Sequence, residues 1–460
     1  MRQLVPISWL VALLIAATLS SGCNPSSSVQ EESLPAGSHP IIQTPNAEPV
    51  GCDEPAANPI IDYDVRQTPS LPELKARQPL HDPVFGTCLI RVSDRHTDLS
   101  PDDASAGLKN EYSRVQSFNA DGSRFILRGI EATWYLYDSR TLQPLAEMPL
   151  EVEPRWDADD ASRIYYTDES RLMVFDIDSW EAAIVHDFAA DFPSVSIGAV
   201  WTRYEGSPSM DGRYWGFMVQ DEEWRTVGLL IYDLIEDKIT ASRSLSGAPD
   251  IDSVTITPLG AYFLAYFDYC EYGAMGTEEN PCGLMVYNSQ LENSRGLLRI
   301  VGHSDTAIDS AGNEVLVYQD IDSDHISMLD LQTGEITPLW PIDFSYSPIG
   351  LHFSGRAFDA PGWVLVSTYS GAQPEAKTWM DDSIFALQLE PGGQVIRLAH
   401  THSLVDEDQE HDYWAEPHAS PNSDFTRILF TSNWGRSGTG EVETYMIQLP
   451  ENWWKMNSDS

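Results

Sequence analysis

Three histidines in the last third of the chain each stand a few residues before a turn rich in Asp, Gly or Pro. They are His303, His352 and His418, and two acidic residues lie at alternate positions beside them, Asp305 and Glu416. Imidazole and carboxylate groups together bind borderline divalent ions such as Mn²⁺ or Zn²⁺. We therefore expect the histidines to hold a divalent metal ion, with Asp305 or Glu416 completing the ligand set. The alternative is that these polar side chains satisfy one another and buried water.

Arginines form a second set of candidates, because positive charge is scarce in this chain. Arg114 and Arg155 stand at places that match those of the histidines in earlier repeats of the chain. Their planar guanidinium groups suit carboxylate or sulfate ligands, and Trp156 and Trp414 offer flat platforms for sugar rings. We expect these four residues to bind a saccharide. For any single arginine, a salt bridge to one of the many Asp and Glu residues is the alternative.

The elements that must position these side chains repeat along the chain. Short runs of β-branched and aromatic residues alternate with turns of Asp, Gly, Asn and Pro, which is typical of strands joined by tight hairpins. Seven units recur at a spacing of roughly 40–65 residues, the range of propeller blades. Their turns lie at 119–124, 157–163, 209–213, 257–260, 309–312, 358–362 and 420–424.

A single blade of this kind cannot bury both of its faces, so the units must close into a ring. We predict an all-β fold, a seven-bladed β-propeller of four-stranded antiparallel blades over residues 84–452. The innermost strand of each blade then lines a central channel and brings the histidines together there. A large pair of β-sandwiches is the alternative fold.

The turns resemble the Ser-Pro-Asp-Gly turn of TolB-like propellers, and segments 82–91 and 413–418 resemble oligogalacturonate lyases. The second resemblance implies a seven-bladed propeller that holds Mn²⁺ on histidines and a glutamine and cleaves an acidic oligosaccharide by β-elimination. Tyr413 stands where that family has the glutamine, and Glu416 replaces the first of two histidines. The residues that this resemblance implies as metal ligands are His418 and His303.

The lyase resemblance also implies a proton acceptor in the channel, for which His352 and Arg356 are the candidates. The TolB-like resemblance implies a different role, a non-catalytic scaffold that contacts another protein of the cell envelope. The sequence leaves both functions open.

The charge balance excludes two classes of partner. The chain has 27 Lys and Arg against 70 Asp and Glu, a formal net charge of −43, which argues against nucleic acid and against anionic lipid head groups. A hydrophobic content of 42% excludes disorder for most of the chain. Residues 24–50, rich in Ser, Pro, Gln and Glu, are expected to form a flexible tether, and 51–83 an N-terminal extension.

The first 23 residues are typical of a bacterial export signal. Their apolar core at 10–17 is too short to span a bilayer. Leu19-Ser-Ser-Gly-Cys23 resembles the lipobox of bacterial lipoproteins, which implies that Cys23 is lipidated and anchors the protein in the cell envelope. Asn24 is not the aspartate associated with inner-membrane retention, which favours the outer membrane. Cleavage that releases a soluble periplasmic protein is the alternative.

Export predicts the state of the remaining four cysteines, because thiols pair in an oxidising compartment. Cys270 and Cys282 bracket a loop that contains Gly and Pro and can fold back on itself. We expect a disulfide between them, which leaves Cys52 to pair with Cys88.

Overall fold

The computed structural model describes residues 47–53, 60–245, 247, 250–370, 376–406 and 409–455. The predicted signal peptide, Cys23 and most of the tether lie outside this part. Within it, no helix has both the length and the apolar character that a membrane span requires.

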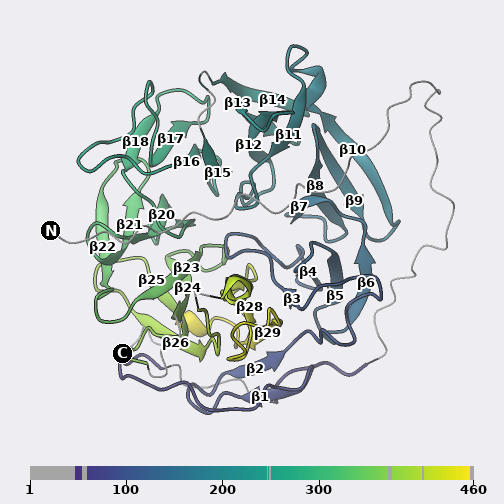
Figure 1. Cartoon of the computed structure of the whole chain (residues 1–460), viewed down its shortest axis with the longest axis vertical. Helices are drawn as coiled ribbons and strands as arrows, with labels where there is room; N and C mark the ends of the chain where they lie inside the picture. The colour runs from purple at the N-terminus through teal and green to yellow at the C-terminus, as the bar shows by residue number, and fades with distance from the viewer. Residues whose placement is uncertain are drawn as a thin grey trace. The chain divides into compact units, whose positions relative to one another are not determined.

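The chain forms seven antiparallel sheets arranged in a ring, which confirms the predicted seven-bladed β-propeller (Figure 1). Six sheets have four strands each, in chain order. The first blade consists of β3(Leu108–Lys109), β4(Arg124–Gly129), β5(Trp134–Asp138) and β6(Pro144–Met148). The second consists of β7(Val152–Trp156), β8(Arg163–Asp168), β9(Arg171–Asp176) and β10(Glu181–Asp187). The third consists of β11(Ile197–Trp201), β12(Tyr214–Asp221), β13(Thr226–Asp233) and β14(Lys238–Ser244).

The next three blades continue around the ring. The fourth blade consists of β15(Ile251–Ile256), β16(Tyr262–Phe267), β17(Leu284–Asn288) and β18(Arg295–Leu298). The fifth consists of β19(Ser304–Ile308), β20(Glu314–Asp320), β21(His325–Asp330) and β22(Ile336–Pro341). The sixth consists of β23(Ile349–Ser354), β24(Trp363–Ser370), β25(Ser383–Gln388) and β26(Val395–His400).

The seventh blade joins the two ends of the propeller. Its strand order is β27(Ser420–Pro421), β28(Arg427–Ser432), β29(Glu443–Gln448), β2(Cys88–Arg91) and β1(Pro79–His81). β2 pairs with β29 in antiparallel register, with Cys88 opposite Gln448. An N-terminal strand therefore closes the ring, and β1 adds a fifth strand at the outer edge.

Local turn chemistry fixes the start of each blade. In the first blade the side-chain oxygen of Asn119 accepts a hydrogen bond from the backbone N–H of Arg124 at 2.9 Å, and Gly122 has φ +67°. Glycine adopts this conformation without a steric penalty, and asparagine caps a tight turn with its own side chain. β4 begins at once after this turn.

The hydrophobic core lies between the blades. Ile126 and Leu136 of the first blade, for example, share one buried cluster with Ile164 and Phe175 of the second. Each sheet thus buries its faces against its neighbours, as a ring of blades requires.

Both predicted disulfides are present, Cys52–Cys88 and Cys270–Cys282, with Cα–Cα distances of 5.8 and 5.1 Å. The first bridge attaches the N-terminal segment to β2, the strand that closes the ring.

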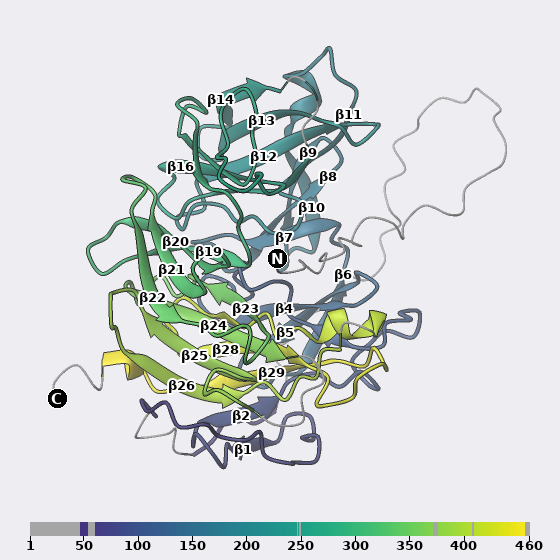
Figure 2. The same ribbon diagram turned by 60° about the vertical axis from the view of Figure 1, so that its left-hand side comes forward.

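Three short 3₁₀ helices complete the described structure, η1(Phe188–Ala190), η2(Glu410–Ala415) and η3(Trp453–Lys455). η2 lies near the middle of the ring on the face toward the viewer in Figure 1, and Figure 2 shows η2 and η3 on opposite faces. The segment that carries Glu416 and His418 leads from η2 into β27.

Candidate metal centre

The three predicted histidines come from three consecutive blades and meet one another. His303 directly precedes β19, His352 lies within β23, and His418 lies two residues before β27. The ring centroids of His303 and His352 are 4.2 Å apart, and those of His352 and His418 are 4.0 Å apart. The structure therefore brings together all three imidazoles that the sequence singled out.

Glu416 adds a carboxylate to this cluster. Its Oε2 lies 2.7 Å from Nε2 of His352 and 3.8 Å from Nε2 of His418. Ligand atoms of His303, His352 and Glu416 all lie within 4.8 Å of one another. Among the described residues, no other group of three potential metal ligands lies this close together.

The imidazoles are in the chemical state that a metal ion needs. Nδ1 of each of the three is buried and has no hydrogen-bond partner, although buried polar atoms normally have one. Burial lowers the pKa of His303 to about 3 and the pKa values of His352 and His418 well below their ordinary range. A neutral imidazole offers a lone pair. Three such groups and one carboxylate fit a divalent transition metal.

The second candidate carboxylate, Asp305, lies apart from this cluster and binds Arg356. Its oxygens accept hydrogen bonds from Nη2 and Nε of Arg356 at 2.9 and 3.1 Å and from the backbone N–H of Gly355 at 2.8 Å. Both side chains are buried. Glu416 and not Asp305 therefore joins the histidines, and the guanidinium of Arg356 forms a salt bridge with Asp305 at 2.9 Å.

Arg114 forms part of the wall beside the histidines. Its Nη1 lies 2.9 Å from a carboxylate oxygen of Glu205, and Nε donates to the backbone oxygen of Ser304. The guanidinium carbon is 5.6 Å from the centroid of Tyr112, whose ring centroid is 4.7 Å from that of His418. Arg114 thus reaches the cluster through Tyr112, with its charge paired.

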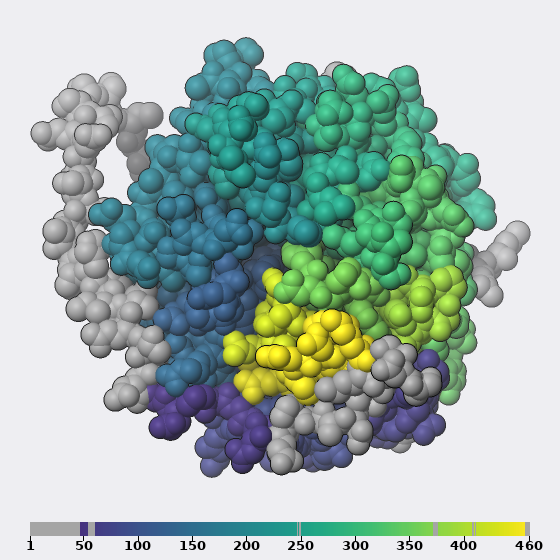
Figure 3. Space-filling view, turned by 180° about the vertical axis from the view of Figure 1, so that it is seen from behind, coloured from purple at the N-terminus to yellow at the C-terminus, as the bar shows by residue number. Residues whose placement is uncertain are grey.

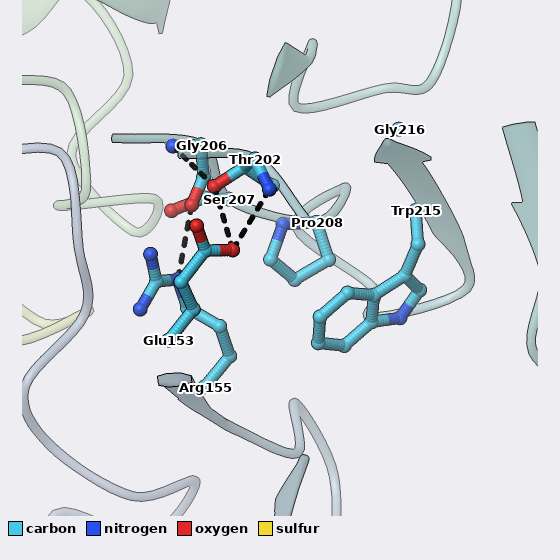
Figure 4. Close-up of a pocket in the computed structure, with 8 residues that line it drawn as sticks. All are labelled: Glu153, Arg155, Thr202, Gly206, Ser207, Pro208, Trp215 and Gly216. Atoms are coloured by element: carbon cyan, nitrogen blue, oxygen red, sulfur yellow. Dashed lines mark hydrogen bonds between the residues drawn. The ribbon is translucent and has the colours of Figure 1, made fainter. Parts of the chain in front are cut away.

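Arg155 also forms a salt bridge, and it holds the loop at 204–206 through hydrogen bonds. Nη1 donates to both carboxylate oxygens of Glu111 at 3.0 and 2.9 Å. Nε donates to the backbone oxygen of Gly206 at 3.0 Å (Figure 4). Nη2 donates to the backbone oxygen of Tyr204. The structure therefore supports the alternative for all three arginines: each forms a salt bridge, namely Arg114, Arg155 and Arg356.

Glu153 holds the same loop from the other side. Its carboxylate accepts hydrogen bonds from the backbone N–H and the hydroxyl of Thr202, both at 2.9 Å (Figure 4). It also accepts one from the backbone N–H of Tyr204. Arg203 and Tyr204 have φ of 63° and 73°, a region that is costly for residues other than glycine. These contacts fix the loop that supplies Glu205 to Arg114.

The two candidate tryptophans lie in different places. Trp156 is buried, and its indole N–H donates to the backbone oxygen of Ser117 at 2.9 Å. Trp414 is half-buried in the segment that leads to the metal cluster, with Nζ of Lys109 5.7 Å from its ring centroid. Of the two, Trp414 is the one placed to contact a ligand near the histidines.

A cavity of about 90 Å³ opens among the loops that carry the Asp-Gly turns. Figure 3 shows a hollow near the centre of one face of the ring. The cavity is bordered by residues that include Arg155, Trp156 and Arg356, together with Phe118 and Phe358. These three predicted residues thus share a cavity whose lining includes none of the three histidines.

Sequence reasoning missed several residues that shape the site. Lys109 lies on β3, and Arg128 lies on β4, the second strand of the same blade. Glu111 and Glu205 lie on the loops that follow the inner strands β3 and β11. The signal that could have found the two cations is their rarity in a chain with 70 acidic residues. The two acidic residues are lost among many similar ones in the sequence.

No protein family model and no curated protein sequence matches this chain. Solved structures do resemble it. An oligogalacturonate lyase in complex with manganese aligns with a TM-score of 0.56 and 17% identity over 82% of this chain and 97% of that one. An oligogalacturonate lyase from Vibrio parahaemolyticus aligns with a TM-score of 0.54 and 13% identity over 81% and 97%. At these identities the similarity shows the seven-bladed propeller fold.

Proposed function

We propose that this protein binds a divalent metal ion, Mn²⁺ or a similar ion, on His303, His352, His418 and Glu416, and an acidic oligosaccharide beside it. The observation that carries the proposal is the meeting of three imidazoles, each with a buried and unpartnered Nδ1, beside one carboxylate. His352 then belongs to the ligand set, and Arg356 positions Asp305.

A divalent ion bound here would neutralise a uronate carboxylate and make the neighbouring C5–H of the sugar more acidic. The chain's own residues would orient the ligand around that point. Tyr112 lies against His418, and Trp414 precedes Glu416 by two residues. The choice of an acidic oligosaccharide is supported by two proteins of similar fold, both described as oligogalacturonate lyases and one as a complex with manganese.

Binding and cleavage are separate parts of the proposal and one experiment distinguishes them. Trigalacturonate is titrated into the protein by calorimetry with and without Mn²⁺, and the ultraviolet absorbance of unsaturated uronides is followed in the same samples. Metal-dependent binding with rising absorbance supports a lyase that acts by β-elimination. Metal-dependent binding without that absorbance supports a binding protein. Absence of binding under both conditions contradicts the proposal.

We also propose that the protein is exported and anchored in the bacterial cell envelope through a lipid on Cys23, at the outer membrane. The two disulfides support an oxidising compartment. Mass spectrometry of the membrane-extracted protein tests this location. A diacylated Cys23 in the wild type and a soluble Cys23→Ser variant are expected, and an unmodified soluble wild type would contradict it.

A further inference from the structure

Two cations face each other across the first blade. Lys109 of β3 and Arg128 of β4 are directly opposed in the antiparallel register. Directly opposed residues project from the same side of a sheet with Cβ atoms about 4.5–5.5 Å apart, and like charges in this arrangement repel. The pair therefore destabilises the blade unless an anion lies near both groups.

Neither residue forms a salt bridge among the described residues. Burial and Arg128 lower the pKa of Lys109 to about 7, while the carboxylates of Glu111 and Glu416 act in the opposite direction. Nζ of Lys109 donates to the backbone oxygen of Glu111 at 2.7 Å, and Nε of Arg128 is buried without a hydrogen-bond partner. Arg114, Arg155 and Arg356, by contrast, all form ion pairs. In a chain with 70 acidic residues and 27 basic ones, two adjacent basic residues without a salt bridge indicate a site for an anion from outside the chain.

The pair also lies close to the candidate metal centre. Nζ of Lys109 is 5.7 Å from the ring of Trp414, two residues before Glu416. The ring centroid of Tyr413 is 5.2 Å from that of Trp414. Burial raises the pKa values of Tyr204 and Tyr413, and the charge of Arg128 opposes this rise in both. These two tyrosines are 44% and 46% exposed, so the Arg128 side of the pair is near solvent.

From this geometry we infer that Lys109 and Arg128 bind a carboxylate of an acidic saccharide, with Trp414, Tyr413 and Tyr204 beside the sugar. The inference rests on the proposed function for the identity of the ligand. Arg128 supplies a planar fork of donors, Lys109 supplies a compact charge, and the aromatic rings offer apolar faces. A sulfate group shares this chemistry, so the experiment includes both kinds of anion.

The test is calorimetric titration of the full-length protein with three probes: trigalacturonate, its methyl ester, and a sulfated trisaccharide without uronate. The variants are Lys109→Met and Arg128→Gln, and the control is Arg163→Gln, which removes an exposed arginine ion-paired with Asp160. We expect each of the first two changes to weaken trigalacturonate binding at least about 10-fold, since charge-assisted hydrogen bonds are lost. The control and the charge-conserving variant Lys109→Arg should bind within about 3-fold of the wild type, as expected for a retained charge.

The outcomes separate this inference from the metal proposal. Metal content should be unchanged in Lys109→Met and Arg128→Gln, so normal metal content with normal trigalacturonate affinity overturns the inference alone. Equal binding of trigalacturonate and its methyl ester also overturns it. Selective binding of the sulfated probe identifies sulfate and contradicts the carboxylate assignment. If a variant does not fold, the wild type in a metal chelator decides: without bound metal, trigalacturonate must still raise its melting temperature more than the methyl ester does.

Discussion

Nε2 of His352 lies 2.7 Å from Oε2 of Glu416, although the two residues belong to neighbouring blades and are 64 positions apart in the sequence. Burial raises the pKa of Glu416. An ionised Glu416 accepts a hydrogen bond from Nε2–H of a neutral His352, and a protonated Glu416 donates one to Nε2. In either state the contact joins the sixth blade to the segment before β27, and Nδ1 of His352 has no partner in the structure.

The buried pair Arg356–Asp305 should stabilise the contact between the fifth and sixth blades. Arg356→Ala would remove the positive charge that faces the buried carboxylate of Asp305. Loss of one partner of a buried ion pair typically lowers the free energy of unfolding by about 3–5 kcal/mol. Urea denaturation followed by tryptophan fluorescence measures the change in the free energy of unfolding. The double change Arg356→Met with Asp305→Leu should cost less than Arg356→Ala. An Arg356→Ala protein as stable as the wild type would contradict the importance of this pair.

The two disulfides should contribute unequally to stability. By loop-closure entropy, a bridge over 36 residues stabilises by about 4 kcal/mol and one over 12 residues by about 3 kcal/mol. The change Cys52→Ser with Cys88→Ser should therefore lower the free energy of unfolding more than Cys270→Ser with Cys282→Ser does. It also releases the N-terminal segment from the strand that closes the ring. Equal losses, or a reversed order, in denaturant melts would argue against this role of the closing strand.

His186 should make stability depend on pH around neutrality. Its two ring nitrogens lie 2.8 Å from carboxylate oxygens of Asp191 and Asp237. Burial alone would lower its pKa, but the hydrogen bonds to the two carboxylates raise it above 6.5. The stabilisation is therefore complete below pH 6.5 and is lost as the pH rises through the higher pKa of the folded state.

The variant His186→Gln isolates this contribution. Its melting temperature should fall below that of the wild type at pH 5.5 and approach it at pH 8.5. The direction follows from the raised pKa. A difference that grows with pH would contradict the assignment.

The sequence predicted the blades well because turn chemistry is local. The seven predicted turns end at positions 124, 163, 213, 260, 312, 362 and 424, and each is followed within a few residues by a strand: β4, β8, β12, β16, β20, β24 and β28. Asn119 illustrates the reason, since its side chain accepts a hydrogen bond from a backbone N–H only five positions later. The strand that closes the ring is non-local, because β2 meets β29 across more than 350 positions.

The site was only partly predictable for the same physical reason. The histidines could be placed on inner strands because each precedes a blade turn. Which carboxylate joined them could not be predicted, because Asp305 and Glu416 are equivalent in sequence terms. That choice depends on which neighbouring side chain faces each one, Arg356 for Asp305 and His352 for Glu416.

Metal content is the most direct test of the central claim. The wild type, the double variant with His303→Ala and His418→Ala, and the control His96→Ala, which removes an exposed histidine, are dialysed against Mn²⁺ and then against buffer, and bound metal is measured by mass spectrometry. A single ion per chain in the wild type and the control, with none in the still-folded double variant, is the predicted result. Wild-type protein without metal, or a double variant that retains it, would contradict the assignment of these histidines as ligands.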